Sequence, residues 1–242
     1  MKLKEEVGTA VPVAAVTPFS TLDWPGMLTA TLFVPGCPWN CPYCHNKESL
    51  ARAGLREWEE VVAFLQKRRR VLDGIVFSGG EPTLYSSLPW TVKFVRSLGY
   101  KAALHTGGPF PDALERLMEE APPDWVGMDY KAPLARYPEI TGDPVSPSTV
   151  PESLRILEES GVDFEIRTTL APEVARWEAV YSMALELAGM GLQGRVWVLQ
   201  QHRSGDIRNG FEVSPPIQLM MEWAERASKL SGLRCRVRSS DN

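Results

Sequence analysis

The stretch TATLFVPGCPWNCPYCHN, residues 29–46, decides how this chain is interpreted. It begins with a short apolar run that contains β-branched residues, which predicts a buried strand over residues 29–34. A Pro-Gly turn then leads into three cysteines, Cys37, Cys41 and Cys44, with the spacing C-x3-C-x2-C. A disulfide framework would spread its cysteines along the chain, so three thiols on one loop predict a metal-binding site.

The residues alone leave two kinds of metal site open. A structural zinc ion normally takes four ligands, and the neighbouring His45 would have to be the fourth. An iron–sulfur cluster held by only three thiolates would keep one iron open for a substrate. The fourth cysteine of the chain, Cys235, is too isolated to join either site, and we expect it to be a small buried residue on an edge strand.

Outward from this loop, strand and helix patterns alternate along the whole chain. Alternation of this kind predicts an α/β fold with a mostly parallel sheet, either an open doubly wound sheet or an incomplete (β/α) barrel. In both architectures the chemistry collects at the carboxyl ends of the strands. The predicted strands are 29–34, 74–77, 102–106, 125–130, 164–169 and 196–200, the predicted helices are 58–71, 88–98, 111–120, 151–160, 173–188 and 215–230, an edge strand follows over 233–237, and the Pro-rich stretch 133–151 is expected to be an ordered loop.

Length, charge and hydropathy exclude several classes of protein. The 242 residues suit a single domain, 1–242, with a core large enough to fold without disulfides. The formal net charge of −4 provides no overall basic field, so no nucleic-acid partner is expected. The chain has no run of about 18 uncharged apolar residues and its N-terminus is a poor signal peptide, so we expect a cytoplasmic protein without a membrane partner.

Polar residues and glycines mark the ends of the predicted strands. The second strand runs into Ser-Gly-Gly-Glu-Pro over residues 78–82, where glycines let the backbone approach a ligand closely. The fourth ends in Asp129 and Lys131, whose side chains share one face of the strand because side chains alternate. The fifth carries Arg167, which either pairs with Glu165 or contacts a ligand.

The cysteine spacing directly after the first strand resembles that of radical S-adenosylmethionine (SAM) enzymes. The resemblance implies an α/β fold of the incomplete (β/α)6 radical SAM barrel type, with a parallel sheet, a core over about 18–202, and the C-terminal helix and edge strand over 215–238. It implies that Cys37, Cys41 and Cys44 hold a 4Fe–4S cluster whose open iron binds SAM. Tyr43 occupies the aromatic position that this family has before its last cysteine.

The same resemblance assigns SAM-binding roles to strand-end residues. Gly79, Gly80 and Glu81 match the Gly-Gly-Glu motif that binds the methionyl ammonium of SAM. Asp129 and Lys131 match the Asp-x-Lys that glycyl-radical activases have near the SAM carboxylate. The remaining assigned residues are Thr106, which matches the activase pattern, Arg167 at the SAM carboxylate or ribose, and His202 at the ribose. His105 stands where activases usually have an aspartate, which puts a cation site beside SAM in doubt.

The stretch TPFSTLDWPG, residues 17–26, resembles the activating proteins of anaerobic ribonucleotide reductase. The resemblance implies a radical SAM oxidoreductase, a glycyl-radical-enzyme activating enzyme that cleaves SAM reductively and generates a glycyl radical on a partner enzyme, anaerobic ribonucleotide reductase. No catalytic side chain is expected beyond the cluster and SAM. The cluster needs an external low-potential electron donor such as flavodoxin or ferredoxin, and the basic run 67–70 is either a solvated helix end or a docking patch for that donor.

Two alternatives stay open. The chain could be a radical SAM enzyme that acts on a small molecule in cofactor or modified-nucleoside synthesis. It could also be a non-catalytic cluster or zinc protein, which the motifs shared across the superfamily disfavour.

Overall fold

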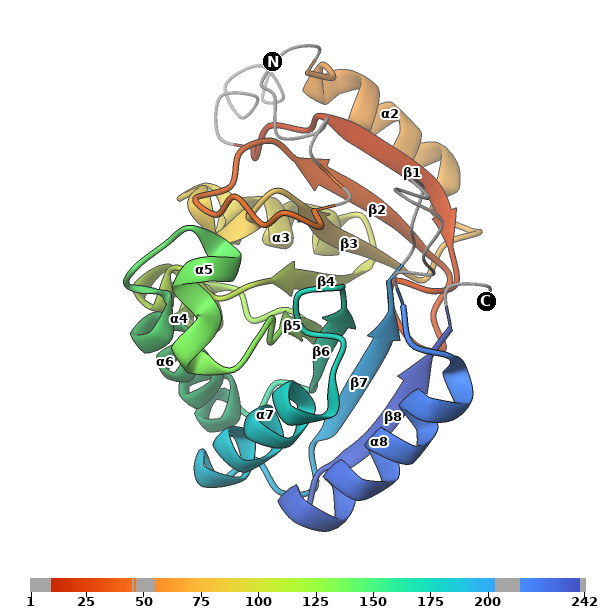
Figure 1. Cartoon of the computed structure of the whole chain (residues 1–242). Coiled ribbons are helices and arrows are strands. Elements are labelled where there is room, and N and C mark those ends of the chain that lie inside the picture. The colour runs from red at the N-terminus through yellow and green to blue at the C-terminus, as the bar shows by residue number, and fades with distance from the viewer. Residues whose placement is uncertain (1–9, 45, 47–54, 203–213, 240–242) are drawn as a thin grey trace. The chain divides into compact units, whose positions relative to one another are not determined.

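The protein has an α/β fold with a mostly parallel, open sheet, as the alternating pattern predicts (Figure 1). The computed structural model describes residues 10–44, 46, 55–202 and 214–239. The strand order follows the sequence from β1 to β8, which leaves β1 and β8 as the two edge strands. The strands are β1 Ala15–Ser20, β2 Thr29–Val34, β3 Gly74–Gly79, β4 Lys101–Thr106, β5 Trp125–Asp129, β6 Phe164–Leu170, β7 Val196–Gln201 and β8 Arg234–Arg238. The helices are α2 Trp58–Arg68, α3 Leu88–Ser97, α4 Pro111–Glu120, α5 Tyr137–Thr141, α6 Ser146–Ser160, α7 Trp177–Gly189 and α8 Ile217–Ser231.

The chain divides into two compact units, which we describe one at a time. The first unit comprises Met1–Pro38, Cys44–Gly127 and Glu152–Asp163. The second comprises Trp39–Tyr43, Met128–Pro151 and Phe164–Asn242. A single domain over 1–242 stays a prediction.

In the first unit, β2, β3 and β4 are parallel neighbours and β1 runs antiparallel along β2. One face of these strands carries aliphatic side chains such as Leu32, Ile75 and Leu104, which are at most 1% exposed. Helix α2 buries Trp58, Val61, Val62 and Leu65, a spacing that places all four on one helix face. Each such burial contributes about 1.5–3 kcal/mol to stability.

The opposite face of these strands is covered by the loop between β1 and β2. Trp24 in this loop is 6% exposed and packs with Val76, Ala103 and Trp125 in one cluster. Its ring stacks on Trp125 with 6.0 Å between the centroids. The stretch that resembles activases is therefore a packed part of the core of this unit rather than a plain turn.

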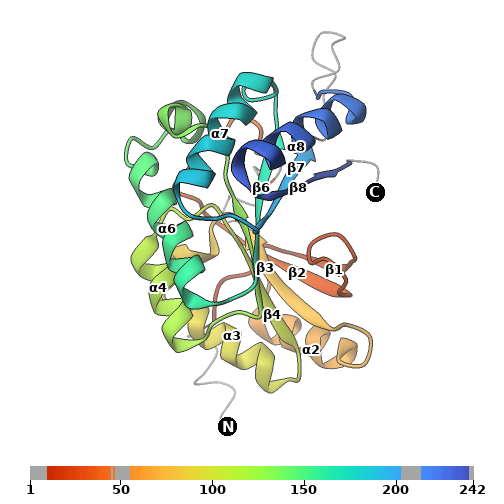
Figure 2. The same ribbon diagram turned by 90° about the horizontal axis from the view of Figure 1, so that it is seen from below.

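In the second unit, β6, β7 and β8 are parallel neighbours. Helices α7 and α8 pack against each other, and α8 also contacts β7 and β8 (Figure 2). Trp197 on β7 is fully buried, and its indole N–H donates to the Thr168 hydroxyl at 2.9 Å. That hydroxyl donates in turn to the Tyr130 carbonyl at 2.6 Å, which ties β6 to the residue after β5.

One strand is not anticipated by the sequence pattern. No strand was predicted over residues 15–20, and Pro18 within them disfavours a central strand. The strand forms at the edge of the sheet, and its pairing with β2 is irregular between Thr17 and Ser20. Pro18 lies within that irregularity, where no ladder hydrogen bond is needed.

Two predictions on helices are wrong. The stretch 133–151 was expected to be a loop, but it contains α5 and the beginning of α6. Helix α6 begins at Ser146, five residues before the predicted start, and Pro147 takes the N-terminal position that we assigned to Pro151. Helix α7 begins at Trp177, four residues later than predicted, because residues 171–174 form a turn in which the Val174 amide donates to the Ala171 carbonyl at 2.9 Å.

Among the described residues, no helix combines the length and the apolar character that crossing a membrane requires.

Candidate functional site

The Gly-Gly-Glu turn after β3 packs backbone to backbone against the residues before Cys37. The Gly80 amide donates to the Val34 carbonyl at 2.8 Å, and the Glu81 amide donates to the Gly36 carbonyl at 2.9 Å. A Cβ atom at Gly80 would lie 1.8 Å from the Gly36 oxygen, so only glycine fits there. Gly79 has φ +108°, which other residues rarely adopt.

Both ends of the cysteine loop are fastened in the first unit. Before Cys37, the Tyr85 hydroxyl donates to the Pro35 carbonyl at 2.7 Å. After Cys44, the Asn46 side-chain amide donates to the Gly79 carbonyl at 3.0 Å. The glycine turn thus holds both ends of the loop that carries the predicted cluster ligands.

The Glu81 carboxylate is 2% exposed and is occupied by hydrogen bonds within the protein. Its Oε1 accepts from the Thr83 amide at 3.1 Å, the Thr83 hydroxyl at 2.6 Å and the Thr106 hydroxyl at 2.7 Å. Its Oε2 accepts from the Gly107 amide at 3.0 Å. Burial raises the pKa of Glu81, whereas these donors lower it. The Glu81 side chain and Thr106 thus join the turn after β3 to the end of β4. Contact of either residue with SAM stays a prediction.

Removing the Glu81 carboxylate is expected to destabilise the protein. In Glu81→Ala the buried amides of Thr83 and Gly107 lose their acceptor, which costs about 1–3 kcal/mol for each unsatisfied group. Urea unfolding should show this loss in Glu81→Ala and little change in Glu115→Ala, a control at an exposed position of α4. Unchanged stability together with lost SAM binding would instead make the carboxylate a direct ligand.

His105 lies next to Thr106 on β4, and its Nε2 is 2.7 Å from the Asp23 carbonyl. The Asp23 carboxylate accepts a hydrogen bond from the Thr31 hydroxyl at 2.6 Å. His105 therefore fastens the loop before β2 to the sheet. An aspartate carboxylate at this position could not do so, because it has no hydrogen to donate to the Asp23 carbonyl.

In the second unit, the middle of the cysteine loop is fastened to α5 and the residues after it. The Asn40 amide donates to the Thr141 carbonyl at 2.8 Å. The Trp39 indole donates to the Asp143 carboxylate at 3.0 Å and packs edge-on against Tyr137. Cys41, which follows Asn40 in the loop, is buried.

Asp129 and Lys131 form the ion pair that their alternation suggests, with 2.8 Å between Oδ2 and Nζ. The ammonium also lies 5.7 Å from the ring centroid of Trp39 in the cysteine loop. Burial alone would lower the pKa of Lys131, but the neighbouring Asp129 carboxylate raises it well above its usual value. Lys131 is therefore a fixed cation beside the loop, suited to hold a ligand carboxylate.

Tyr43 and His202, both predicted to contact SAM, lie together in the second unit. Their rings meet edge to face at 6.3 Å. The Tyr43 hydroxyl oxygen is buried and has no hydrogen-bond partner among the described residues. Burial raises the pKa of Tyr43 and lowers that of His202, so both side chains are neutral near pH 7.

Arg167 pairs with Glu165, which is one of the two alternatives left open by the sequence. Its Nε donates to Glu165 Oε1 at 2.8 Å, and Arg238 on β8 donates to the same oxygen at 2.9 Å. Burial lowers the pKa of Arg167, while the Glu165 carboxylate raises it. Arg238 had no sequence signal, because its contact spans 73 residues. Binding of SAM by Arg167 stays a prediction.

Glu165→Ala is expected to be strongly destabilising, because Arg167 is 6% exposed and would lose the carboxylate to which its Nε donates. Breaking a buried ion pair on one side typically costs about 3–5 kcal/mol. Thermal and urea unfolding should show the effect. Glu159→Ala, which removes one carboxylate from the exposed pair with Arg155, should change stability little; equal effects of the two substitutions would contradict this account.

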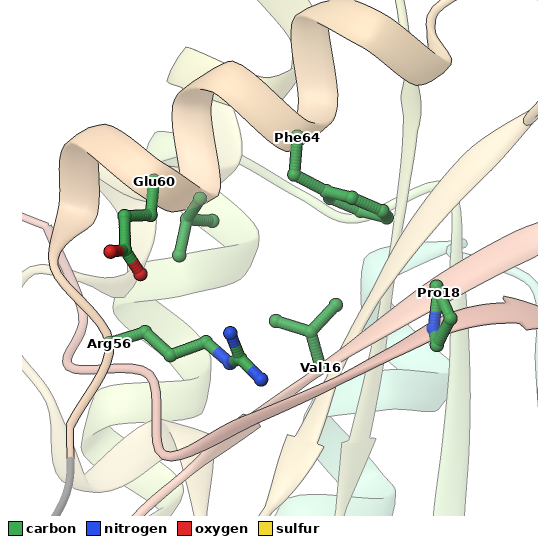
Figure 3. A pocket seen from close by; sticks show the side chains of 6 residues that line it. Val16, Pro18, Arg56, Glu60 and Phe64 are labelled. Carbon is green, nitrogen blue, oxygen red and sulfur yellow. The ribbon is translucent and has the colours of Figure 1, made fainter.

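The pocket in Figure 3 contains none of the predicted site residues. It has a volume of about 220 Å³ and lies between β1 and α2 in the first unit. Val16, Pro18, Arg56, Glu60, Val61 and Phe64 line it. Because none of these residues is a predicted ligand of the cluster or of SAM, the pocket is separate from the candidate site.

The residues present fit a cluster and SAM by the chemistry of their donor atoms. All four cysteines are thiols, and three of them lie on the fastened loop. The buried hydroxyl of Tyr43 is a feature that a closely bound ligand would use. Among the described residues, no three His, Cys, Asp or Glu side chains lie close enough to hold a metal ion. His45, the fourth ligand that zinc would need, lies outside the described residues.

Comparison with known proteins identifies the family. The model of the radical SAM superfamily matches residues 31–184. A protein of Methanocaldococcus jannaschii named as a glycyl-radical enzyme activating enzyme is 29% identical over 182 residues, which are 71% of this chain and 73% of the relative. The 7-carboxy-7-deazaguanine synthase of Aquifex aeolicus is 30% identical over 83 residues, 34% of this chain and 37% of the relative.

A solved structure shows the same fold at low identity. SuiB of Streptococcus suis, crystallised with S-adenosylmethionine, matches with a TM-score of 0.62 and 13% identity. The match covers 86% of this chain, which spans about half the length of SuiB.

The chain belongs to the radical SAM superfamily. It is a radical SAM enzyme whose cofactors are a 4Fe–4S cluster and SAM. When bound, the two together supply one-electron cleavage of SAM and with it a group that abstracts hydrogen atoms. The chain's own residues must fasten the ligand loop, orient SAM and exclude water.

Proposed function

We propose that this enzyme activates a glycyl-radical enzyme by removing a hydrogen atom from one glycine Cα of that partner. The observation that carries the proposal is the similarity, over 71% of the chain, to the M. jannaschii protein named as an activating enzyme. The cysteines Cys37, Cys41 and Cys44 would hold the cluster. Roles in SAM binding are proposed for Tyr43, the Gly79–Glu81 turn, Asp129 and Lys131.

The partner that we propose is anaerobic ribonucleotide reductase. Support comes from the stretch 17–26, which resembles the activating proteins of that reductase and in which Trp24 is part of the packed core of the first unit. The reaction needs a low-potential electron donor, which we propose is an external flavodoxin or ferredoxin. Thiol ligands and a reduced cluster both favour a reducing compartment, so we propose the cytoplasm.

The basic run 67–70 is a poor docking site for that donor. It covers the last two residues of α2 and the two residues after them, and it precedes β3, so it lies toward the end of the sheet at which β3 begins. The Gly79–Glu81 turn that fastens the cysteine loop lies at the other end of β3, six residues away, a distance on the order of 17–20 Å. We therefore assign these charges to the C-terminal end of α2, where they complement its dipole.

A second candidate function has one observation in its favour. The similarity to the Aquifex 7-carboxy-7-deazaguanine synthase suggests a small-molecule substrate instead of a glycine of a partner protein. Its coverage of 34% of this chain is less than half that of the M. jannaschii relative, and for this reason we place it second.

Isotope transfer separates the two functions. The partner reductase is prepared with glycine deuterated at Cα and incubated with SAM and the reduced enzyme. Transfer of deuterium into the 5′-deoxyadenosine product, detected by mass spectrometry, supports the proposal; a partner with its radical glycine replaced by alanine is the control. Unlabelled 5′-deoxyadenosine whose formation depends on a small metabolite would establish the second function.

A further inference from the structure

The strands β6, β7 and β8 of the second unit present a row of arginines on one face of their sheet. The register pairs Arg167 on β6 with Val198 on β7, and Val198 with Arg236 on β8, so these side chains point to the same side. Arg234 and Arg238 lie two residues before and after Arg236 and share its face, because side chains alternate along a strand. We call Arg167, Arg234, Arg236 and Arg238 the arginine face.

The arginine face points away from the helix that covers β8. Cys235, which lies between the first two arginines of β8, points to the other side of the strand. There, hydroxyl groups of α8 form hydrogen bonds with its thiol. Arg234 and Arg236 are exposed. Arg238 is half-buried and Arg167 is buried, so the face is open to solvent at the edge strand and closed toward β6.

The positive charge of this face is mostly uncompensated. Among the described residues of β6, β7 and β8, Glu165 is the one acid, and two guanidinium groups share its Oε1 at 2.8 and 2.9 Å. Arg234 Nε donates to a backbone carbonyl at 2.8 Å, and Arg236 has no hydrogen-bond or ion-pair partner among the described residues. The charge of Asp129 also reaches the row, but its carboxylate is already paired with Lys131 at 2.8 Å. Four arginines and one glutamate leave a net charge of +3 on this face of a chain whose net charge is −4.

Within the second unit, the arginine face extends toward the candidate site. Arg238 is in register with Gln200, which lies two residues before His202. The His202 ring in turn lies 6.3 Å from the ring of Tyr43 in the cysteine loop. The Arg238 end of the row is therefore the end that approaches this loop.

A protein segment that carries carboxylates is the ligand that fits this face. A guanidinium group binds a carboxylate through two parallel hydrogen bonds. The row from Arg234 to Arg238 is about 13 Å long, which matches about four residues of an extended peptide. Nucleic acid fits less well, because its binding needs many cationic contacts and the net negative charge of the chain repels it. The segment would lie on the face and not extend the sheet, because the Cys235 amide at the free edge already donates to the Ser228 hydroxyl at 2.9 Å.

We propose that the arginine face docks an acidic, extended segment of the partner protein, whose carboxylates pair with Arg234 and Arg236. A partner held there has the residues that adjoin this segment beside the candidate site. The inference rests on the proposed function in one respect, namely that the target of the enzyme is a protein.

Binding of a short acidic peptide tests the docking without turnover. One fluorescein-labelled probe alternates glutamate with serine, and its counterpart has glutamine in place of every glutamate. Fluorescence anisotropy measures the binding of both to the enzyme with its oxidised cluster. At low salt the glutamate peptide should bind at least about tenfold more tightly, since each of several exposed charge pairs contributes up to about fivefold. This preference should decrease as salt is added.

The decisive variant is Arg236→Gln, because Arg236 is exposed and holds no described residue in place. It should weaken binding of the glutamate peptide by about three- to fivefold, and the double variant with Arg234→Gln by at least about tenfold. Arg116→Gln, at an exposed position of α4 in the first unit, makes the same change in net charge and should bind the peptide like the wild type. Arg236→Gln and Arg116→Gln should both keep the wild-type unfolding midpoint.

Three results would overturn the inference. Equal binding of the two peptides, or equal weakening by Arg236→Gln and Arg116→Gln, would show that no docking occurs at this face. Displacement of the peptide by inorganic triphosphate that binds more tightly would make the face a phosphate site. Self-association of Arg236→Gln, with wild-type affinity for the peptide, would mean that the arginines only protect the edge of the sheet from pairing.

The partner reductase separates this inference from the proposed function. Its affinity for the enzyme, measured without SAM, should fall at least about threefold in Arg236→Gln and stay unchanged in Arg116→Gln. A glycyl radical formed on a reductase whose affinity does not depend on Arg236 would overturn the docking alone. Arginine-dependent binding of the acidic peptide, without a glycyl radical on the reductase, would count against the proposed function and support the docking of an acidic segment.

Discussion

Replacing Cys37, Cys41 or Cys44 by alanine, one at a time, is expected to abolish the iron–sulfur cluster and all SAM cleavage. The wild-type chain, reconstituted anaerobically, should hold about four iron atoms with broad visible absorption. Each substitution removes one of only three thiolate ligands on the loop, so no cubane cluster can be retained. Iron and sulfide analysis together with the visible spectrum checks this expectation.

Cys235→Ala is the matched control for these variants. Cys235 lies on the edge strand β8 as predicted, but it is partly exposed and not buried. Its amide donates to the Ser228 hydroxyl at 2.9 Å, and partial burial raises the pKa of its thiol. It is far along the chain from the loop and should leave the iron content unchanged. A stoichiometric zinc ion that excludes iron, or a cluster that persists in Cys41→Ala, would contradict the assignment.

Gly80→Ala is expected to have the next largest effect. The added Cβ would lie 1.8 Å from the Gly36 oxygen and 2.6 Å from the Gly36 carbonyl carbon, and backbone atoms cannot rotate away as a side chain can. The chain must move Gly36, and with it the start of the loop at Cys37. We expect a loss of several kcal/mol of stability and at least about a hundredfold weaker SAM binding, since strained or overpacked sites cost amounts of this order.

The control is Gly189→Ala at the end of α7. A Cβ atom there meets nothing within 4 Å, so this variant should bind SAM and unfold like the wild type. Thermal unfolding and equilibrium binding of SAM to both variants measure the difference. Wild-type SAM binding by Gly80→Ala would show that the turn does not support the cysteine loop.

Local patterns were sufficient to predict most of the fold. The predicted strand over 29–34 and helix over 111–120 agree with the bounds of β2 and α4, because their hydrophobic periods are clear and turns flank them. Two of the failures, at β1 and at the start of α6, share a cause. Prolines normally end strands and helices, but Pro18 sits in an irregular edge strand and Pro147 in a first helical turn, positions where a missing amide costs little.

In the candidate site, residues in local motifs could be predicted from the sequence, but contacts between distant residues could not. Cys37, Gly80 and Asp129 could be predicted as site residues from the sequence because their motifs are local in the chain. The bond from Thr106 to Glu81 and that from Arg238 to Glu165 span 25 and 73 residues, and such partners depend on the fold.

Electron paramagnetic resonance on the partner enzyme tests the central claim most directly. The reduced enzyme, SAM and the anaerobic ribonucleotide reductase of the same organism are mixed without oxygen, and the spectrum is recorded. The account predicts a glycyl-radical doublet on the reductase, absent when its radical glycine is replaced by alanine and absent with the Cys41→Ala enzyme. SAM cleavage by the enzyme without any doublet on that reductase would contradict it.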